Sequence, residues 1–199
     1  CWQNGLSGCW GNSDCTGSFS GNIAGWNYFK NGGYGLVVHN GVNPIGPTPY
    51  GDQFIALDGG QAGYCGPGNT YVEQTVSGFV SGQTYQLSFA ISSEGSQHPV
   101  PAISRIGVSL VNATPTGTTI FSATGWGGRL WDTWVSHTLS FVPSGSSVTF
   151  RFEHVDPSPL IKLNGVGLDA VSLNPPCVTP PAGMVAWWPL DETLGPTAS

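Results

Sequence analysis

The sequence predicts an all-β fold, an antiparallel β-sandwich of the jelly-roll type, and three observations support this. Apolar and polar residues alternate with a period of two through most of the chain, as they do in strands with one buried face. Clusters of Gly, Pro, Asn and Ser interrupt these runs about every dozen residues, as turns do. No segment of ten residues has the periodicity of an amphipathic helix. Roughly eight to ten short strands at this spacing are typical of a sandwich.

The alternation is clearest in three segments. In 84–92, Tyr85, Leu87 and Phe89 alternate with Gln86 and Ser88, and 135–142 and 147–155 repeat the pattern. Six further segments have the composition of strands. In chain order, the predicted strands are 34–40, 53–59, 71–78, 84–92, 103–111, 118–124, 135–142, 147–155 and 165–173.

These strands define one domain with short flanking segments. Residues 1–14 form a Cys- and Trp-rich N-terminal segment, and residues 15–174 form the sandwich. Residues 175–182 are rich in proline, which is excluded from the interior of a sheet, so they are predicted to be a linker. Residues 183–199 are predicted to be a C-terminal strand or the start of a second domain.

The charge content narrows the class of partner. Charged residues make up 8% of the chain, and five basic against eleven acidic side chains give a net charge of -6. Such a chain offers no basic surface for phosphate backbones, so nucleic acid is not expected as a partner. No apolar run is long enough to cross a bilayer, so no membrane span is expected either.

An extracellular or cell-surface location is expected, with any export signal already removed.

The cysteines are predicted to form disulfides with one cysteine left over, because none has the spacing of a zinc site. Asn112 lies in the only Asn-x-Ser/Thr sequon, which predicts a surface position if the source glycosylates. The five cysteines are Cys1, Cys9, Cys15, Cys65 and Cys177.

Several motifs in order resemble a known group of domains. They are "CTGSFSGNIAGW", "GQTYQLSFAI", "WDTWVSHTLSFVPSGSSVTFRFEH" and "GVGLDAVSL", within residues 15–174. This pattern resembles the galactose-binding-like jelly rolls of secreted proteins. Among them are carbohydrate-binding modules of the family 4/9/22 kind, and the domain-of-unknown-function 642 and choice-of-anchor domains of bacterial surface proteins. The resemblance implies a secreted, non-catalytic sandwich that often recognises polysaccharide and often carries one structural calcium.

The calcium expectation depends on two positions. Asp169 matches the aspartate of the last strand in the family, whereas Ser20 stands where the family has an acidic residue. Calcium takes six to eight oxygen ligands and usually more than one carboxylate. Two roles for Asp169 therefore stay open: a ligand of one structural Ca²⁺, or an acceptor for backbone amides at a turn.

The C-terminal run "GMVAWWPLDETLG" is similar to the opening strand of concanavalin-like, laminin-G-type sandwiches. A strand on a Pro-rich arm suits donor-strand addition to an exposed sheet edge. It is predicted either to fold back on its own sandwich or to dock on a neighbouring copy. The residues expected to carry such self-association are Val185, Trp187, Trp188 and Leu190.

A sugar site needs aromatic side chains, because pyranose rings stack their C–H faces on them. Spare aromatics are predicted in loops, among them Trp26, Tyr28, Phe29 and Tyr50. The best candidate is 126–132, where Trp126 would stack and Arg129 and Asp132 would supply a donor and an acceptor, with packing of Trp126 within the loop as the equal alternative. For Trp131 and Trp134 the alternative to sugar contact is packing in the core and at the sheet edge, which the family resemblance favours for Trp134.

Catalysis is not expected. Asp52 and Asp58 are six residues apart, about 20 Å on an extended strand, which exceeds the separation of a glycosidase carboxylate pair. The sequence therefore predicts an extracellular, non-catalytic binding module, carbohydrate-binding or adhesive, with a polysaccharide or glycan as partner. The alternative is a structural subunit of a fibre or surface layer that associates through its C-terminal strand.

Overall fold

The computed structural model describes residues 2–3, 7–8, 25–30, 34–39, 48–51, 53–58, 70–94, 102–125, 131–155 and 165–174. Within these ranges every regular element is a β-strand, and none is a helix that could cross a membrane. In chain order the strands are β1 (Trp2–Gln3), β2 (Ser7–Gly8), β3 (Asn27–Lys30), β4 (Tyr34–His39), β5 (Gln53–Asp58), β6 (Thr70–Ser77), β7 (Tyr85–Ser93), β8 (Ala102–Val111), β9 (Ala113–Thr114), β10 (Thr118–Gly125), β11 (Trp134–Pro143), β12 (Ser147–His154) and β13 (Val166–Asn174).

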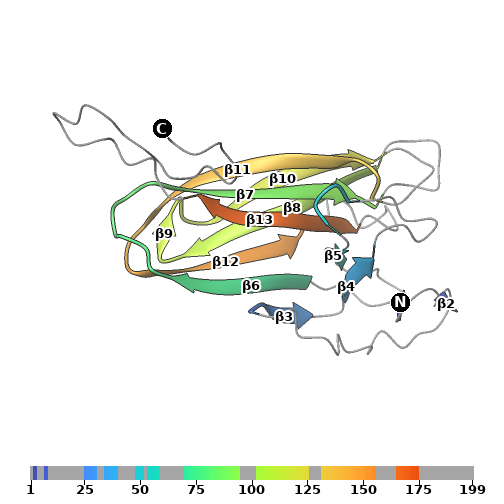
Figure 1. Cartoon of the computed structure of the whole chain (residues 1–199), viewed down its shortest axis with the longest axis horizontal. Coiled ribbons are helices and arrows are strands. Elements are labelled where there is room, and N and C mark those ends of the chain that lie inside the picture. Colours follow the sequence, from blue (N-terminus) through green and yellow to red (C-terminus); the bar gives the residue numbers. More distant parts are fainter. Residues whose placement is uncertain are drawn as a thin grey trace, which may run out of the picture.

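Eleven of these strands form two antiparallel sheets that pack face to face, and β1 and β2 pair separately with each other. One is five-stranded, in the order β10-β8-β12-β6-β3, and the other is six-stranded, in the order β4-β5-β13-β7-β11-β9. Figure 1 shows β7, β11 and β13 in one layer and β6 and β12 in the other. The predicted antiparallel sandwich is confirmed, and each of the nine predicted strands is present to within one residue at either end. The strand β3 and the short β1, β2 and β9 were not predicted.

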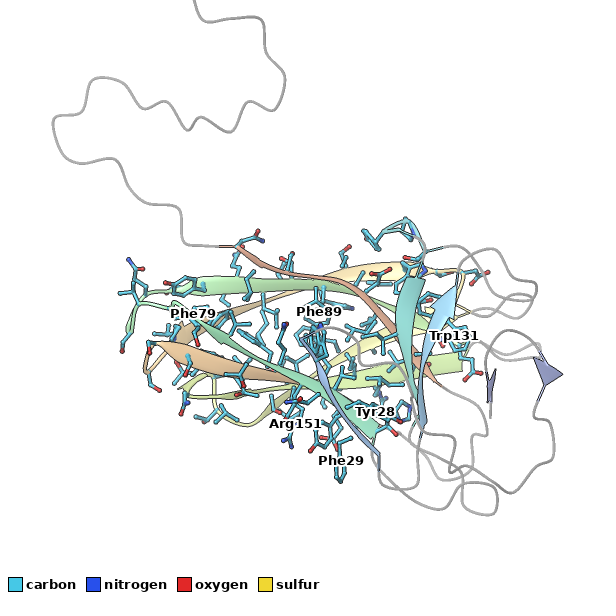
Figure 2. The ribbon with its side chains drawn as sticks, turned by 60° about the horizontal axis from the view of Figure 1, so that its bottom comes forward. Tyr28, Phe29, Phe79, Phe89, Trp131 and Arg151 are labelled. Atoms are coloured by element: carbon cyan, nitrogen blue, oxygen red, sulfur yellow. The ribbon has the colours of Figure 1, made fainter. Side chains whose placement is uncertain are left out.

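The core lies between the two sheets and follows from the period of two. In β12, Val148, Phe150 and Phe152 are each at most 2% exposed, while Arg151 and Glu153 point to the other face. Phenylalanine rings meet edge to face in this layer: Phe89 of β7 meets Phe152 of β12, and Phe79, which follows β6, meets Phe141 of β11. Figure 2 labels Phe79 and Phe89 between the two sheets. Each fully buried side chain of this size stabilises the fold by about 1.5–3 kcal/mol.

The connection between β8 and β9 explains the position of the sequon. Asn112 is exposed and has a φ of 66°, in the left-handed region that asparagine tolerates better than most residues. Its backbone carbonyl accepts a hydrogen bond from the Ser144 amide at 2.9 Å. The predicted surface position of Asn112 is confirmed.

Candidate functional site

The outer face of the five-stranded sheet presents a row of side chains that crosses all five strands. In the strand registers, Phe29 of β3 lies opposite Tyr71 of β6, and Tyr71 lies opposite Glu153 of β12. Glu153 in turn lies opposite Gly107 of β8, and Gly107 lies opposite Ile120 of β10. Residues opposite one another in antiparallel strands point to the same face. The row therefore forms one continuous strip of surface.

Aromatic side chains occupy one end of this strip. The rings of Phe29 and Tyr71 are stacked, with centroids 4.8 Å apart and planes inclined by 20°. The Arg151 guanidinium carbon lies 4.0 Å from the centroid of the Tyr71 ring, a cation–π contact. Phe29 is 46% exposed, although burial would stabilise a residue of this type. Figure 2 shows Phe29 and Arg151 on the same outer side of the sandwich.

An ion pair lies beside the aromatic rings. The Nε and Nη2 groups of Arg151 donate to the same Glu73 oxygen, Oε2, at 2.9 and 2.7 Å. This hydrogen bond is the main reason that the pKa of Arg151 is raised, and burial opposes it. Because both bonds end on Oε2, the Oε1 atom of Glu73 and the Nη1 group of Arg151 form an acceptor and a donor for a ligand. We call Phe29, Tyr71, Arg151 and Glu73 the aromatic platform.

The formal charges on this face cancel. Arg105 and Arg151 lie on it together with Glu73 and Glu153, at outward positions of β8, β12 and β6. Among the described residues of the face, two positive charges therefore meet two negative charges. The electrostatic potential of the face therefore favours neither an anionic nor a cationic ligand.

The structure corrects the location predicted for Trp26 and Tyr28. Instead of lying in a loop, Tyr28 belongs to β3, and Trp26 precedes that strand by one residue. Both are partly buried against the main core, with the Trp26 ring 5.9 Å from that of Phe152. Since alternate residues of a strand point to opposite faces, Tyr28 points inward and Phe29 outward. The exposed aromatic of this segment is therefore Phe29.

The predicted site in 126–132 is only partly described. Trp126 and Arg129 lie outside the described residues, so their role stays a prediction. Asp132 is exposed, and its Oδ1 accepts a bond from the Thr133 hydroxyl at 3.3 Å. It precedes β11 of the six-stranded sheet, whereas the aromatic platform is on the other sheet.

Aromatic packing covers part of the outer face of the six-stranded sheet. Phe54, Ala56 and Trp131 form a second buried cluster, and Trp134 packs against it. Trp131 is 3% exposed, so of the two roles left open for it packing is the one observed, and Trp134 has the packing role that the resemblance favours. Gly167 lies beneath both indoles, and a Cβ atom there would be 3.0 Å from Trp131 and 3.1 Å from Trp134.

Asp169 stabilises an irregularity in β13. The register of β13 with β7 shifts between Asp169 and Ser172, and Ala170 has a φ of 52°. Asp169 Oδ1 accepts from the Ala170 amide at 2.7 Å, and Oδ2 accepts from the Thr48 hydroxyl at 2.6 Å. These bonds match the second predicted role, an acceptor at a turn. No group of three potential metal-ligating side chains occurs among the described residues, and calcium stays a prediction.

Other predictions fall outside the described residues. The assembly residues Val185, Trp187, Trp188 and Leu190 do so, as does Ser20. The same holds for Cys1, Cys9, Cys15, Cys65 and Cys177. Self-association and disulfide formation therefore stay predictions.

No protein-family model matches the sequence, and no curated protein matches it. The K1 cleaved adhesin domain of Lys-gingipain from Porphyromonas gingivalis W83 has a similar structure, with a TM-score of 0.52, 15% identity, and coverage of 77% of this chain and 92% of that one. TmCBM61, solved in complex with β-1,4-galactotriose, gives a TM-score of 0.49 and 12% identity over 81% of this chain and 92% of that one. The enzymatically active domain of tailspike protein 4 of bacteriophage CBA120 gives 0.48 and 12%, and the match covers 77% of this chain but 20% of the tailspike chain. At these identities the likeness concerns the fold alone, a sandwich shared with the adhesin domain.

Sequence reasoning placed Phe29 in a loop and missed the rest of the aromatic platform, although a signal was present. The outward positions of the predicted strand 71–78 begin with Tyr71 and Glu73, and those of 147–155 include Arg151. A large aromatic in the outward phase of a strand is unusual on a purely solvated face. The stacking of Tyr71 on Phe29 depends on the pairing of β3 with β6, which the sequence does not indicate.

Proposed function

We propose that this protein is an extracellular, non-catalytic carbohydrate-binding module whose glycan contacts the aromatic platform. One observation supports this most strongly: a stacked aromatic pair, of which the Phe29 ring is exposed, lies next to an Arg–Glu ion pair on the outer face of a sheet. Sugars present apolar C–H faces and hydroxyl groups side by side, and this surface offers a partner to each.

The energetics of the platform favour a preformed site. Phe29 and Arg151 belong to β3 and β12, which both pair with β6. Both side chains pack on the Tyr71 ring, and two hydrogen bonds to Glu73 also hold Arg151 in place. A ligand therefore orders few side chains when it binds, which lowers the entropic cost of association. The Arg151 side chain is 37% exposed and that of Glu73 is 22% exposed, so both are accessible to ligand hydroxyls.

The location and the lack of catalysis rest on the sequence. A charged content of 8% and abundant Gly support an extracellular role, because solubility then depends on neutral polar side chains. The sequence has neither a nucleophile-elbow pattern nor histidines with metal spacing, which supports binding rather than hydrolysis.

A glycan array followed by isothermal titration calorimetry tests the proposal. The whole chain should bind at least one glycan, and Phe29→Ala should lower the affinity about tenfold or more, because the stacking surface is lost. Thermal unfolding should show that this variant is folded, since Phe29 is 46% exposed.

Tyr50→Ala is the matched control. Tyr50 is 43% exposed and contacts Trp134 of the six-stranded sheet. The substitution therefore removes an exposed aromatic side chain from the layer opposite the aromatic platform. It should bind glycan as the natural chain does. Absence of glycan binding by the natural chain, or a loss confined to Tyr50→Ala, contradicts the proposed site.

A further inference from the structure

We infer that the ligand is an uncharged, linear oligosaccharide that lies across the strands and makes a second apolar contact at Ile120, beyond the aromatic platform. This inference rests on the proposed function and extends it to the length and charge class of the glycan. It concerns the whole strip from Phe29 to Ile120.

The length of the strip indicates an oligosaccharide rather than a single sugar. The five residues of the row lie on five adjacent strands, in the order β3, β6, β12, β8 and β10. Four steps between neighbouring strands, each about 4.8 Å, give a strip about 19 Å long. A monosaccharide on Phe29 would leave the other end of this strip without contact.

Gly107 shapes the far end of the strip. A Cβ atom at this position would lie 2.7 Å from Thr118 Cγ2, 3.0 Å from Val155 Cγ2 and 3.5 Å from Ile120 Cδ1. These methyl groups therefore lie over the backbone of β8, where a side chain would otherwise stand. Ile120 is nevertheless 48% exposed on the edge strand β10. The result is a low apolar surface that suits the C–H face of a second sugar.

Polar groups occupy the middle of the strip. Glu153 lies between Tyr71 and Gly107 in the row, and Arg151 lies two residues away on the same face of the same strand, above the Tyr71 ring. Hydroxyl groups of a sugar between the two apolar contacts would meet these side chains and Glu73. A strip with apolar ends and a polar centre therefore matches a chain of at least three sugars.

The charges on the face indicate an uncharged glycan. Arg151 is already paired with Glu73 at 2.7 Å, and Glu153 lies in the same part of the strip. A uronic acid in the middle of the strip would have to compete with Glu73 for Arg151, and its carboxylate would be repelled by Glu153. Hydroxyl groups can donate to the carboxylates and accept from Arg151, so neutral sugars fit both signs of charge.

Calorimetry with a length series tests the inference. The probes are neutral β-1,4-linked oligosaccharides of galactose, xylose, mannose and glucose, from disaccharide to hexasaccharide, together with β-1,4-linked oligomannuronates. The affinity of the natural chain should rise with length up to about the tetrasaccharide, and oligomannuronates should bind more weakly than β-1,4-oligomannosides of equal length, from which they differ only by the carboxylate.

Ile120→Ser separates this inference from the proposed function. It should lower the affinity for the hexasaccharide about five- to tenfold and leave that for the disaccharide unchanged, whereas Phe29→Ala should weaken both. Val80→Ser is the matched control, because Val80 is 55% exposed and lies in the turn after β6. It should change neither affinity.

The results that overturn the inference differ from those that overturn the function. If the natural chain binds glycan through Phe29 but equally well at all lengths, or if Ile120→Ser has no effect, the extended footprint is wrong. Stronger binding of oligomannuronates than of oligomannosides of equal length refutes the uncharged class. If no glycan binds at all, both the function and the inference fail.

Discussion

Substitution of Gly167 by alanine should destabilise the fold by a predictable amount. Gly167 lies in β13 beneath Trp131, Trp134 and Phe54, and an added Cβ would lie 3.0, 3.1 and 3.3 Å from their rings. All three distances are shorter than ordinary van der Waals contact, and Trp131 and Phe54 are at most 3% exposed. The rings must therefore move together. Overpacking of this kind typically costs about 1–3 kcal/mol in the free energy of unfolding.

Urea unfolding followed by tryptophan fluorescence measures this cost, with Gly145→Ala as control. Gly145 lies in the turn between β11 and β12, and a Cβ there would meet nothing within 4 Å. Gly145→Ala should therefore leave stability nearly unchanged. Each kcal/mol should also lower Tm by about 2–4 °C for a domain of this size. If the two variants are equally stable, the packing argument at Gly167 is wrong.

Three further predictions concern single side chains. Burial lowers the pKa of His137, and a hydrogen bond to the Ser122 backbone partly offsets this, so the folded state favours the neutral ring. The free energy of unfolding should therefore fall as the pH drops from about 6.5, the pKa in the unfolded chain, through the lower pKa of the folded state. His137→Gln should show a smaller fall. Glu94, 4% exposed, accepts from the Gly165 amide at 2.8 Å, so Glu94→Ala should cost about 1–3 kcal/mol in urea unfolding, and Glu94→Gln less. Phe89→Ala should cost about 3–5 kcal/mol, and a cost below 1 kcal/mol would contradict its place in the core.

The alternation of residues was sufficient to predict most of the fold. In β7 the inward Leu87, Phe89 and Ile91 are all at most 2% exposed, as their period predicts. The order of the strands in the sheets could not be predicted this way, because periodicity gives the buried face of a strand but not its neighbour. The strand β3 was missed because four residues are too short for an alternation to stand out.

The site was predicted less well than the fold. Phe29 and Tyr71 are 42 residues apart in the sequence, and their stacking exists only because β3 pairs with β6. Arg151, on β12, lies beside the same rings although it is 80 residues from Tyr71 in the sequence. The prediction instead favoured 126–132, where an aromatic, a cation and an acid are close in the sequence. Proximity along the chain is a poor guide on a sheet, since its surface is assembled from distant strands.

The alternation in β12 separates two properties along a single strand. Val148, Phe150 and Phe152 hold the layers together, while the intervening Arg151 and Glu153 face solvent and any ligand. Evolution or a protein engineer can therefore retune recognition at every second position without disturbing the interior. A saturation scan of this strand should yield two interleaved classes of variant, one that fails to fold and one that folds normally with altered selectivity.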